Sequence, residues 1–340
     1  MNGLENKKNL TILAIESSCD ETACAVLKDG VILGEAISTQ IAIHKEYGGV
    51  VPEIASRNHV LDVDKVVKTC LNESGIDLKE VDAIAVTYGA GLLGSLLVGV
   101  SYAKGLAYAL DKPLLGVNHI RGHVAANYLV HDLEFPHVAL IVSGGHSALA
   151  VVETKIRFHI VGSTRDDAAG EAFDKVARVL DLPYPGGPEI EKLASLGHPS
   201  VPMPKVKMQN PYDFSYSGLK TAVINYVYNA KQKGVEINKA DLACSFQKAA
   251  VDMLAEKAVA LAEEKGLKSI AVAGGVAANG ALRDTLTALA EEKGIKTYFP
   301  PKKLCTDNAK MIASEAYGQI RSGCDFSDYR LDASATLPFS

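Results

Sequence analysis

The chain has 340 residues, with 35 Lys and Arg against 40 Asp and Glu, so its formal net charge is −5. Hydrophobic residues make up 48% and charged residues 22%, which is a globular composition and excludes a disordered or collagenous chain. The mild acidity excludes a protein that coats nucleic acid, because such proteins carry a basic balance. The length indicates about two domains.

The cysteines and the apolar stretches bear on location. Six cysteines without a C-x-x-C pair are too sparse for a disulfide scaffold, so we expect reduced thiols in a cytoplasmic protein. The first apolar run carries Glu16, and we expect no signal peptide. The longest apolar stretch, Leu92–Leu110, contains interspersed polar residues and predicts a buried helix rather than a membrane span.

The first elements are strands. Leu10–Glu16 predicts a buried strand, Ser17–Thr22 a polar turn, and Ala23–Ser38 two strands around Asp29-Gly30, which is a strong hairpin signal. Pro136–Ser163 repeats this order, with an apolar run, a Gly-Gly turn and two further strands. The chain therefore opens each of two halves in the same way.

Each half then continues with two units of strand, loop and helix. This alternation predicts parallel strands covered by helices, with ligands bound beyond the carboxyl ends of the strands. We therefore predict an α/β protein of two repeated halves whose glycine-rich loops face a central cleft, with a helical insertion at about residues 183–240. The four units are Asp82–Leu110 and Pro113–Leu129 in the first half, and Ser269–Gly294 and Lys296–Tyr317 in the second.

A candidate metal site lies in the third unit of each half. His119 and His123 are four residues apart, which places both on one face of a helix. The residues between them include no carboxylate, so the general base of an H-E-x-x-H protease is missing. Asp307 at the equivalent junction completes a two-His, one-carboxylate set suited to Fe(II), with Zn(II) next. Cys305 is an alternative ligand, and two histidines on a polar face are the alternative to any metal.

Two turns are candidate phosphate sites. Glu16–Thr22 offers small hydroxyl residues and free backbone amides, and Asp20 or Glu21 is a candidate to orient an incoming amine. A solvated hairpin turn is the alternative. Val142–Ser147 occupies the matching place in the second half, where its paired glycines allow close approach to an anion.

Further candidates in the second half suit a nucleoside. Ala273–Asn279 follows a strand and opens a helix, with Asn279 either contacting a ligand or capping the helix. Asp174 lies one turn into a helix whose first acids are otherwise dipole and capping residues. Gly187 belongs to a Gly-Gly turn before another helix.

In combination these motifs closely resemble the TsaD family, the tRNA N6-adenosine threonylcarbamoyltransferases once called O-sialoglycoprotein endopeptidases. The resemblance covers residues 12–316, nearly the whole chain. The motifs are IESSCDETACAV, HKEYGGVVPEIASRNH, NHIRGH, VSGGHS, DDAAGEAFDK, YPGGP, DFSYSGLKT, AGGVAAN and CTDNAKMIA.

The resemblance implies an actin-like ATPase (ASKHA) fold with two duplicated RNase H-like domains. The expected division is a disordered tail over residues 1–9, an N-terminal domain over 10–130, and a C-terminal domain over 131–325 that contains the insertion. Residues 326–340 are expected to form a tail that packs back.

The resemblance also implies an activity, a cofactor and a substrate site. The activity is transfer of a threonylcarbamoyl group from threonylcarbamoyl-AMP to N6 of adenosine 37 in tRNAs that read codons beginning with A, which forms t6A and releases AMP. One metal, usually iron, is implied at His119, His123 and Asp307. Glu191 departs from the Asp of many relatives. Substrate contacts are implied at Ile141, Val142, Ser143, Gly144, Gly145, Asp174, Gly187 and Asn279, with Glu191 as an additional candidate.

The implied partners are tRNA, a TsaB-like paralogue and a TsaE-like ATPase, with a TsaC-like enzyme supplying the adenylate and no membrane involved. A non-catalytic nucleotide-binding scaffold, a sugar kinase and a glycoprotease remain as alternatives, the last disfavoured by the missing glutamate. Cations beside aromatic residues suit phosphates and an unstacked base, so we expect tRNA to dock on the insertion. The residues are Lys205, Lys207 and Lys220, with Tyr212, Phe214 and Tyr216.

Overall fold

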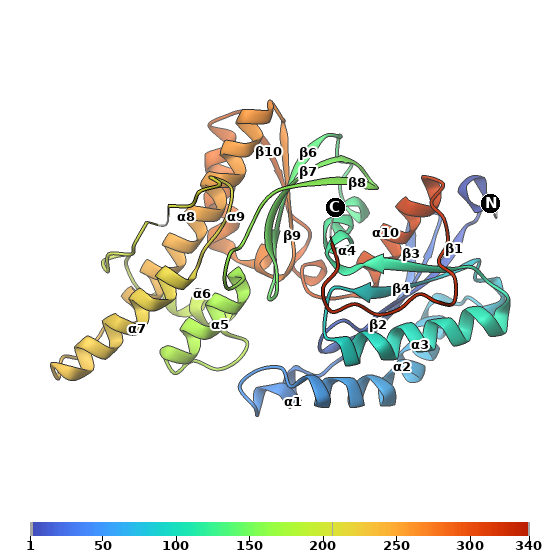
Figure 1. The fold of residues 1–340 in the computed structure, drawn as a ribbon, viewed down its shortest axis with the longest axis horizontal. Helices are drawn as coiled ribbons and strands as arrows, with labels where there is room; N and C mark the ends of the chain where they lie inside the picture. The colour runs from blue at the N-terminus through green and yellow to red at the C-terminus, as the bar shows by residue number, and fades with distance from the viewer. Residues whose placement is uncertain (1–2, 206, 339–340) are drawn as a thin grey trace. The chain divides into compact units, whose positions relative to one another are not determined.

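A computed structural model describes residues 3–205 and 207–338, and its internal contacts divide the chain into two units (Figure 1). The first unit comprises the chain up to Asp132, a short piece at Thr154–Phe158, and the chain from Thr306 onward. The second unit comprises Leu133–Glu153 and His159–Cys305. Each unit is built on a five-stranded sheet.

The first sheet has the order β3-β2-β1-β4-β5, with the first three strands antiparallel and the last three parallel. Its strands are β1 (Thr11–Glu16), β2 (Glu21–Lys28), β3 (Val31–Thr39), β4 (Ala83–Gly89) and β5 (Leu114–Asn118). The helices of this unit are α1 (Ile41–Lys45), α2 (Pro52–Ser74), α3 (Leu93–Leu110), α4 (His119–Ala125) and α10 (Ala309–Arg321), with short 3-10 turns at Leu4–Asn6, Leu78–Glu80 and Ala126–Leu129.

The predicted hairpin between β2 and β3 is confirmed. Lys28 pairs with Val31, so Asp29 and Gly30 form a two-residue loop. Both loop residues have positive φ, at 46° and 85°, as a type I′ turn requires.

Alternation along β1 explains why its six residues are all buried. Ile12 and Ala14 point into a core that includes Ile312 of α10, while Leu13 and Ile15 point into a core formed with α2 and α3. Side chains on a strand alternate between faces, so a strand covered on both sides is apolar throughout. This explains the unbroken apolar run in the sequence.

Within the described residues, α3 is the one helix whose length and composition would allow it to cross a membrane. Its inner face packs against α2 and β4 and buries Leu96, Val100 and Ala103. One face of the helix therefore packs into the first unit's core, whereas the outer face leaves Leu93 and Leu97 exposed, so the predicted burial holds for the inner face only.

The second sheet has the order β10-β9-β6-β7-β8. Read from the opposite end, this is the order of the first sheet, with β6 to β10 in the places of β1 to β5. The predicted repeat is thus confirmed. The strands are β6 (His137–Val142), β7 (Ser147–Thr154), β8 (Arg157–Ser163), β9 (Ser269–Ala273) and β10 (Lys296–Tyr298). The helices are α5 (Ala169–Val179), α6 (Gly186–Ala194), α7 (Ser217–Gln232), α8 (Lys239–Lys265) and α9 (Gly280–Glu291), with 3-10 turns at Gly275–Ala278 and Lys302–Leu304.

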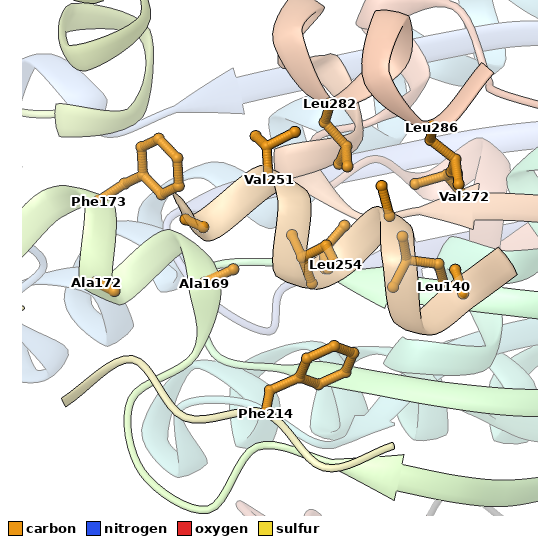
Figure 2. Packing of buried hydrophobic residues seen from close by; sticks show 14 of the residues in the cluster. Leu140, Ala169, Ala172, Phe173, Phe214, Val251, Leu254, Val272, Leu282 and Leu286 are labelled. Carbon is orange, nitrogen blue, oxygen red and sulfur yellow. The ribbon is translucent and has the colours of Figure 1, made fainter. Parts of the chain in front are cut away.

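Helix α8 forms the centre of the second unit's hydrophobic core. Figure 2 shows Val251 and Leu254 of α8 beside Leu282 of α9 and Leu140 of β6. This helix is buried along nearly its whole length because α6 and α9 both pack against it. The sheet and these helices together form the platform that carries the glycine-rich loops.

The start of the chain differs from the expected disordered tail. Leu4 packs against the first unit's core, and Lys7 forms an ion pair with Asp82. The Arg321 guanidinium donates hydrogen bonds to the carbonyls of Glu5 and Lys7, at 3.0 and 2.8 Å. Gly3–Asn9 is therefore ordered by contacts from distant parts of the chain, while residues 1–2 lie outside the described residues.

The end of the chain groups with the first unit rather than with the second half. Met311 and Ile312 of α10 are fully buried in the core that covers β1, which explains the grouping. Downstream, the amide of Ser327 donates to the Leu114 carbonyl and that of Ser334 to the Tyr88 carbonyl, each at 2.8 Å. The described part of residues 326–340 thus returns to the first sheet, and residues 339–340 lie outside it.

Candidate active site

Helix α4 carries both candidate histidine ligands. It begins directly after β5, where the Asn118 side chain accepts hydrogen bonds from the amides of Ile120 and Arg121, at 2.9 and 3.3 Å. This N-cap fixes His119 as the first residue of the helix, and His123 follows one turn later. Their rings lie 4.6 Å apart between centroids, as the sequence spacing predicted.

The candidate carboxylate lies just before helix α10, at the junction equivalent to the start of α4. Asn308 caps this helix by accepting from the Met311 amide at 3.0 Å, and Asp307 immediately precedes the cap. One half of the repeat thus supplies Asn-His and the other Asp-Asn at equivalent junctions. The two capped starts hold all three candidate ligands in the first unit.

The three side chains converge. Nε2 of His119 lies 3.4 Å from Oδ1 of Asp307, and Nε2 of His123 lies 3.1 Å from the same oxygen. One ligand atom from each residue lies within 4.8 Å of the other two. Both histidines are buried and Asp307 is partly buried, so water is largely excluded from this cluster.

These separations fit a metal centre. Two ligand atoms each about 2.0–2.2 Å from one ion, at tetrahedral or octahedral angles, stand about 2.9–3.5 Å apart. Nε2 of His123 is buried and makes no hydrogen bond within the described residues, despite its closeness to Asp307. A shared cation explains why a buried nitrogen is aimed at a carboxylate without forming a hydrogen bond. The residues present are therefore compatible with a single bound metal.

Glu16, which was not among the residues predicted from the sequence, supports this centre. Its side chain is fully buried at the end of β1, with Oε2 3.3 Å from Nδ1 of His119. The Ser18 hydroxyl lies 3.0 Å from the same nitrogen, and Thr87 donates to Glu16 at 2.5 Å. Such contacts fix the ring and leave Nε2 free for a metal. The available signal was a carboxylate ending an otherwise apolar strand.

The charge distribution around the cluster calls for a cation. Burial acts to lower the pKa of His119, but Asp307 and Glu16 raise it to about 9. Burial, followed by Asp307 and Asp20, raises the pKa of Glu21 to about 9. Crowded carboxylates thus favour positive charge at the His119 imidazole and oppose further negative charge on Glu21. Asp307 therefore acts electrostatically on Glu21 of the β1–β2 turn.

Three of the contacts between helices α4 and α10 are specific to particular side chains. One is a close approach at Gly122, where a Cβ would lie 2.8 Å from Cδ1 of Ile312. The Ser314 hydroxyl donates to the Ala125 carbonyl at 2.8 Å. The third contact is a buried ion pair, in which the guanidinium of Arg121 donates to Glu315 at 2.8 Å.

Cys305, the alternative ligand, lies elsewhere. Its thiol is buried in the core of the second unit and contacts the carbonyls of Pro300 and Pro301 at 3.6 Å. Among the described residues the metal-ligand cluster comprises His119, His123 and Asp307.

The second unit presents the expected glycine loop between β6 and β7. Ser143 closes the loop, with its amide donating to the His146 carbonyl at 2.8 Å and its carbonyl accepting from Gly170 at 3.1 Å. Gly144 and Gly145 are exposed, and a Cβ on either would meet open space. Their amides lie beside the first turn of α5 and donate no hydrogen bond within the described residues. Such amides can bind an anion.

Ile141 and Val142 occupy a different position from the rest of the predicted substrate set. Both are fully buried strand residues, and the Val142 side chain belongs to the hydrophobic core. Any ligand contact at these two positions must therefore come from the backbone.

Asp174 and the Gly-Gly turn lie together at the start of α6. The Asp174 carboxylate accepts from the Gly186 amide at 2.7 Å. Burial raises the pKa of Asp174, although the amides of Gly186 and Gly187 act in the opposite direction. A Cβ at Gly186 would lie 2.5 Å from that of Ala177, whereas a Cβ at Gly187 would meet open space. Gly186 therefore serves packing, and Gly187 faces an open position.

Glu191 and Asn279 meet at the start of α9. Oε1 of Glu191 accepts from the Gly280 amide at 2.8 Å, and Oδ1 of Asn279 accepts from the Leu282 amide at 3.0 Å. The amide group of Asn279 also donates to Gln247 of α8 at 3.0 Å. Both candidates thus satisfy free amides at a helix start, which is the alternative role considered for Asn279.

The cap role of Asn279 gives a direct prediction. We expect Asn279→Ala to lower the free energy of unfolding by about 1 kcal/mol, because an α9 amide loses its partner. Asn279→Asp keeps the capping oxygen and is expected to retain stability. Urea unfolding of both variants measures this, and equal stability of Asn279→Ala and the parent would contradict the cap assignment.

The aromatic residues expected to bind tRNA are core residues instead, so that prediction is wrong. Phe214 and Tyr216 are fully buried, and Tyr212 is 9% exposed. Lys220 is tied to Asp167 in an ion pair of 2.5 Å. The pattern of aromatics between cations reflected packing of the insertion onto the second sheet.

Comparison with solved structures defines the class of protein. Full-length HypF superposes with a TM-score of 0.63 at 16% identity, covering 93% of this chain and 47% of that one. Component A of the (R)-2-hydroxyglutaryl-CoA dehydratase of Acidaminococcus fermentans gives a TM-score of 0.53 at 17% identity, covering 92% and 99%. At such identities the likeness shows the fold alone. With its duplicated sheets, the chain is a protein of the actin-like ATPase fold.

Comparison with protein families defines the chain more closely. The model of the family TsaD, tRNA N6-adenosine threonylcarbamoyltransferase, matches residues 31–314. Proteins of that name from Moorella thermoacetica and Clostridium beijerinckii are each 54% identical, over 97% and 96% of this chain and 97% of their own lengths. One from Bacillus cereus is 52% identical over 91% of both chains. The chain belongs to the TsaD family. It is an acyltransferase that acts on tRNA and forms t6A.

Proposed function

We propose that the chain takes the threonylcarbamoyl group from threonylcarbamoyl-AMP and that one metal ion, held by His119, His123 and Asp307, is required. The observation that carries this proposal is the convergence of both Nε2 atoms on Oδ1 of Asp307, with Glu16 orienting His119. Two imidazoles and one carboxylate favour Fe(II), with Zn(II) next. When bound, the cation supplies Lewis-acid stabilisation of negative charge on the donor's oxygens.

The second unit's residues bind the donor. The free amides of Gly144 and Gly145 stabilise its phosphate or carbonyl oxygens, with Ser143 holding the loop in shape. Asp174 and the open position at Gly187 receive the adenosine. One oxygen of the Asp174 carboxylate accepts a hydrogen bond from the start of α6, which holds this side chain in place. Glu191 and Asn279 position this region by fixing the start of α9 rather than by direct recognition.

The chemical step joins N6 of adenosine to the carbamoyl carbon. The N6 lone pair attacks that carbon, the bond from carbon to the phosphate oxygen breaks, and AMP leaves with the electron pair. The N6 nitrogen loses one proton, which passes to solvent water and balances the step. Asp20 and Glu21, the carboxylates of the β1–β2 turn, are suited to orient the amine.

Partner proteins require a surface, and α2 and α3 provide an apolar one. Val60 and Leu61 of α2 are 62% and 63% exposed, and Leu93 and Leu97 of α3 are exposed as well. The two helices run side by side, with Ser56 against Gly94, so these side chains lie along one face. A TsaB-like paralogue is proposed as the occupant, and a TsaE-like ATPase acts on the resulting complex. A cytoplasmic location is part of this proposal, and a tRNA-modifying activity supports it.

The partner surface is testable by charge insertion. We expect Val60→Asp combined with Leu97→Asp to weaken association with the paralogue at least tenfold, because burying an unpaired carboxylate is costly. Binding of the paralogue by isothermal calorimetry measures the effect, with the exposed Tyr108→Asp on α3 as a control. Unchanged association in the double variant would show that the paralogue does not bind through this face.

The function itself is tested by reconstitution. The chain, its partners, an unmodified tRNA, threonine, bicarbonate and ATP are combined, and the nucleosides are analysed by mass spectrometry for t6A. A second reaction supplies purified threonylcarbamoyl-AMP in place of the small precursors. Formation of t6A in the second reaction supports the proposed donor, whereas t6A in the first reaction alone would show that the donor is a different species.

A further inference from the structure

Beyond its first two turns, α7 has no buried residue, and the helix lies at the outer edge of the second unit (Figure 1). Leu219 and Val223 hold its inner face against the core. On the opposite face Ile224, Tyr228 and Lys231 follow one another at helical spacing, and Tyr228 is 60% exposed. This face therefore presents an aromatic ring between an aliphatic side chain and a cation.

The same face carries amides but no carboxylate. Asn225 and Gln232 flank Tyr228, and the Gln232 amide donates to the Tyr228 hydroxyl at 2.8 Å. No Asp or Glu occurs in residues 217–235 of the sequence. The helix thus offers hydrogen-bonding groups and an aromatic surface without any group that repels a phosphate.

The local charge opposes that of the whole protein. Residues 199–235 contain five lysines and one aspartate, a net charge of +4 in a chain whose net charge is −5. The aspartate, Asp213, is 3% exposed and is neutralised by Arg165 at 2.5 Å. Lys231 and Lys233 are exposed, as are Lys205 and Lys207 upstream. Residues 199–235 are therefore a basic stretch of the insertion that complements a polyanion.

The base of α7 is connected to the donor loop within the second unit. Lys220 pairs with Asp167, and the Tyr216 amide donates to Asp166 at 2.8 Å. These two acids immediately precede α5, whose Gly170 packs against the Gly144 backbone. The base of α7 is thus linked, through residues within the second unit, to the loop proposed to bind the donor.

We propose that the exposed face of α7 is a tRNA-binding surface, with Tyr228 stacking on an unpaired base and Lys231 and Lys233 contacting phosphates. Aromatic rings beside cations suit single-stranded RNA, whose bases are free to stack. A protein partner is disfavoured here, because the apolar side chains exposed on α2 and α3 already form a more hydrophobic surface. The proposal rests on the tRNA transfer reaction and deepens it.

The test measures binding of an unmodified tRNA transcript to the chain in complex with its partners, at several salt concentrations. Tyr228→Ala is expected to weaken binding about tenfold. Lys231→Ala with Lys233→Ala is expected to lower the slope of log affinity against log salt by roughly 1.5. Lys265→Ala, at the end of α8 in an ion pair with Glu264, is the matched control and is expected to leave both quantities unchanged.

Kinetics separate this proposal from failure of the transfer mechanism. The α7 variants are expected to raise KM for tRNA while leaving kcat, the metal content and the thermal unfolding midpoint at parent values. If the parent protein bound tRNA through α7 but made no t6A, the transfer proposal alone would fail. Unchanged affinity and salt slope in the variants would overturn the α7 proposal. So would loss of association with the paralogue at unchanged tRNA affinity, which would make α7 a protein interface.

Discussion

Replacing His123 with alanine is expected to abolish both stoichiometric metal binding and tRNA modification. His123 supplies one of three candidate ligands, and its Nε2 is buried 3.1 Å from Asp307. Removing one ligand leaves two groups, too few for a stable centre. Since Lewis-acid stabilisation is worth several kcal/mol, the single-turnover rate should fall by roughly 1000-fold or more. Elemental analysis and rapid-quench transfer assays measure the two effects.

Two further variants sharpen this prediction. Glu16→Gln keeps the size of the side chain but removes the charge beside Nδ1 of His119, and it should weaken metal affinity by about 10- to 100-fold. His159→Ala removes a histidine that is 58% exposed and should change neither metal content nor rate. Full metal content and a parent-like rate in His123→Ala would contradict the assignment of the centre.

Replacing Arg121 with alanine is expected to cost about 3–5 kcal/mol of unfolding free energy. The variant leaves the carboxyl of Glu315, which is 1% exposed, without its guanidinium partner. Gln319 still donates to Glu315 at 2.9 Å, but a neutral amide compensates a buried charge only in part. Urea unfolding of metal-free protein measures the loss without a contribution from metal binding.

The pH dependence of that loss has a defined sign. Burial raises the pKa of Glu315 in the folded protein, against the opposing effect of Arg121. Removing Arg121 raises it further, so the variant's penalty is absent below the unfolded pKa and grows as pH rises through neutrality. A loss that is equal at pH 4 and pH 7 would contradict this account.

A matched double variant separates charge from packing. Arg121→Met with Glu315→Leu replaces the ion pair by apolar groups and is expected to recover most of the lost stability. Since this ion pair links α4 to α10, which carry the candidate ligands, metal affinity should fall in Arg121→Ala and recover partly in the double variant. Equal stability of Arg121→Ala and the double variant would indicate that the buried charge is not the cause.

The sequence predicted the features that depend on local pattern. Positive φ at Asp29 and Gly30 follows from the hairpin signal, and the shared face of His119 and His123 follows from helical spacing. Asp307 was reached through the repeat, because equivalent junctions of a duplicated fold occupy equivalent places. These predictions needed no knowledge of which helices pack together.

Features that depend on tertiary packing were not predictable in this way. Glu16 reads as the end of a strand, and its contact with His119 joins positions 103 residues apart. Phe214 is polar-flanked in the sequence yet fully buried, because the insertion folds back onto the second sheet. Glu191 stands where many relatives carry an Asp implied to contact substrate. Its side chain is longer than that of Asp and reaches the start of α9. Long-range contacts decide each of these cases.

The most direct test of the account is single-turnover transfer with purified threonylcarbamoyl-AMP, unmodified tRNA and the assembled complex. The parent chain is expected to form t6A at adenosine 37, with one AMP released per nucleoside modified. The complex that contains His119→Ala is expected to release no AMP and form no t6A while still binding tRNA. Parent-like t6A formation by that complex would show that the transfer does not depend on the His-His-Asp cluster and would contradict the account.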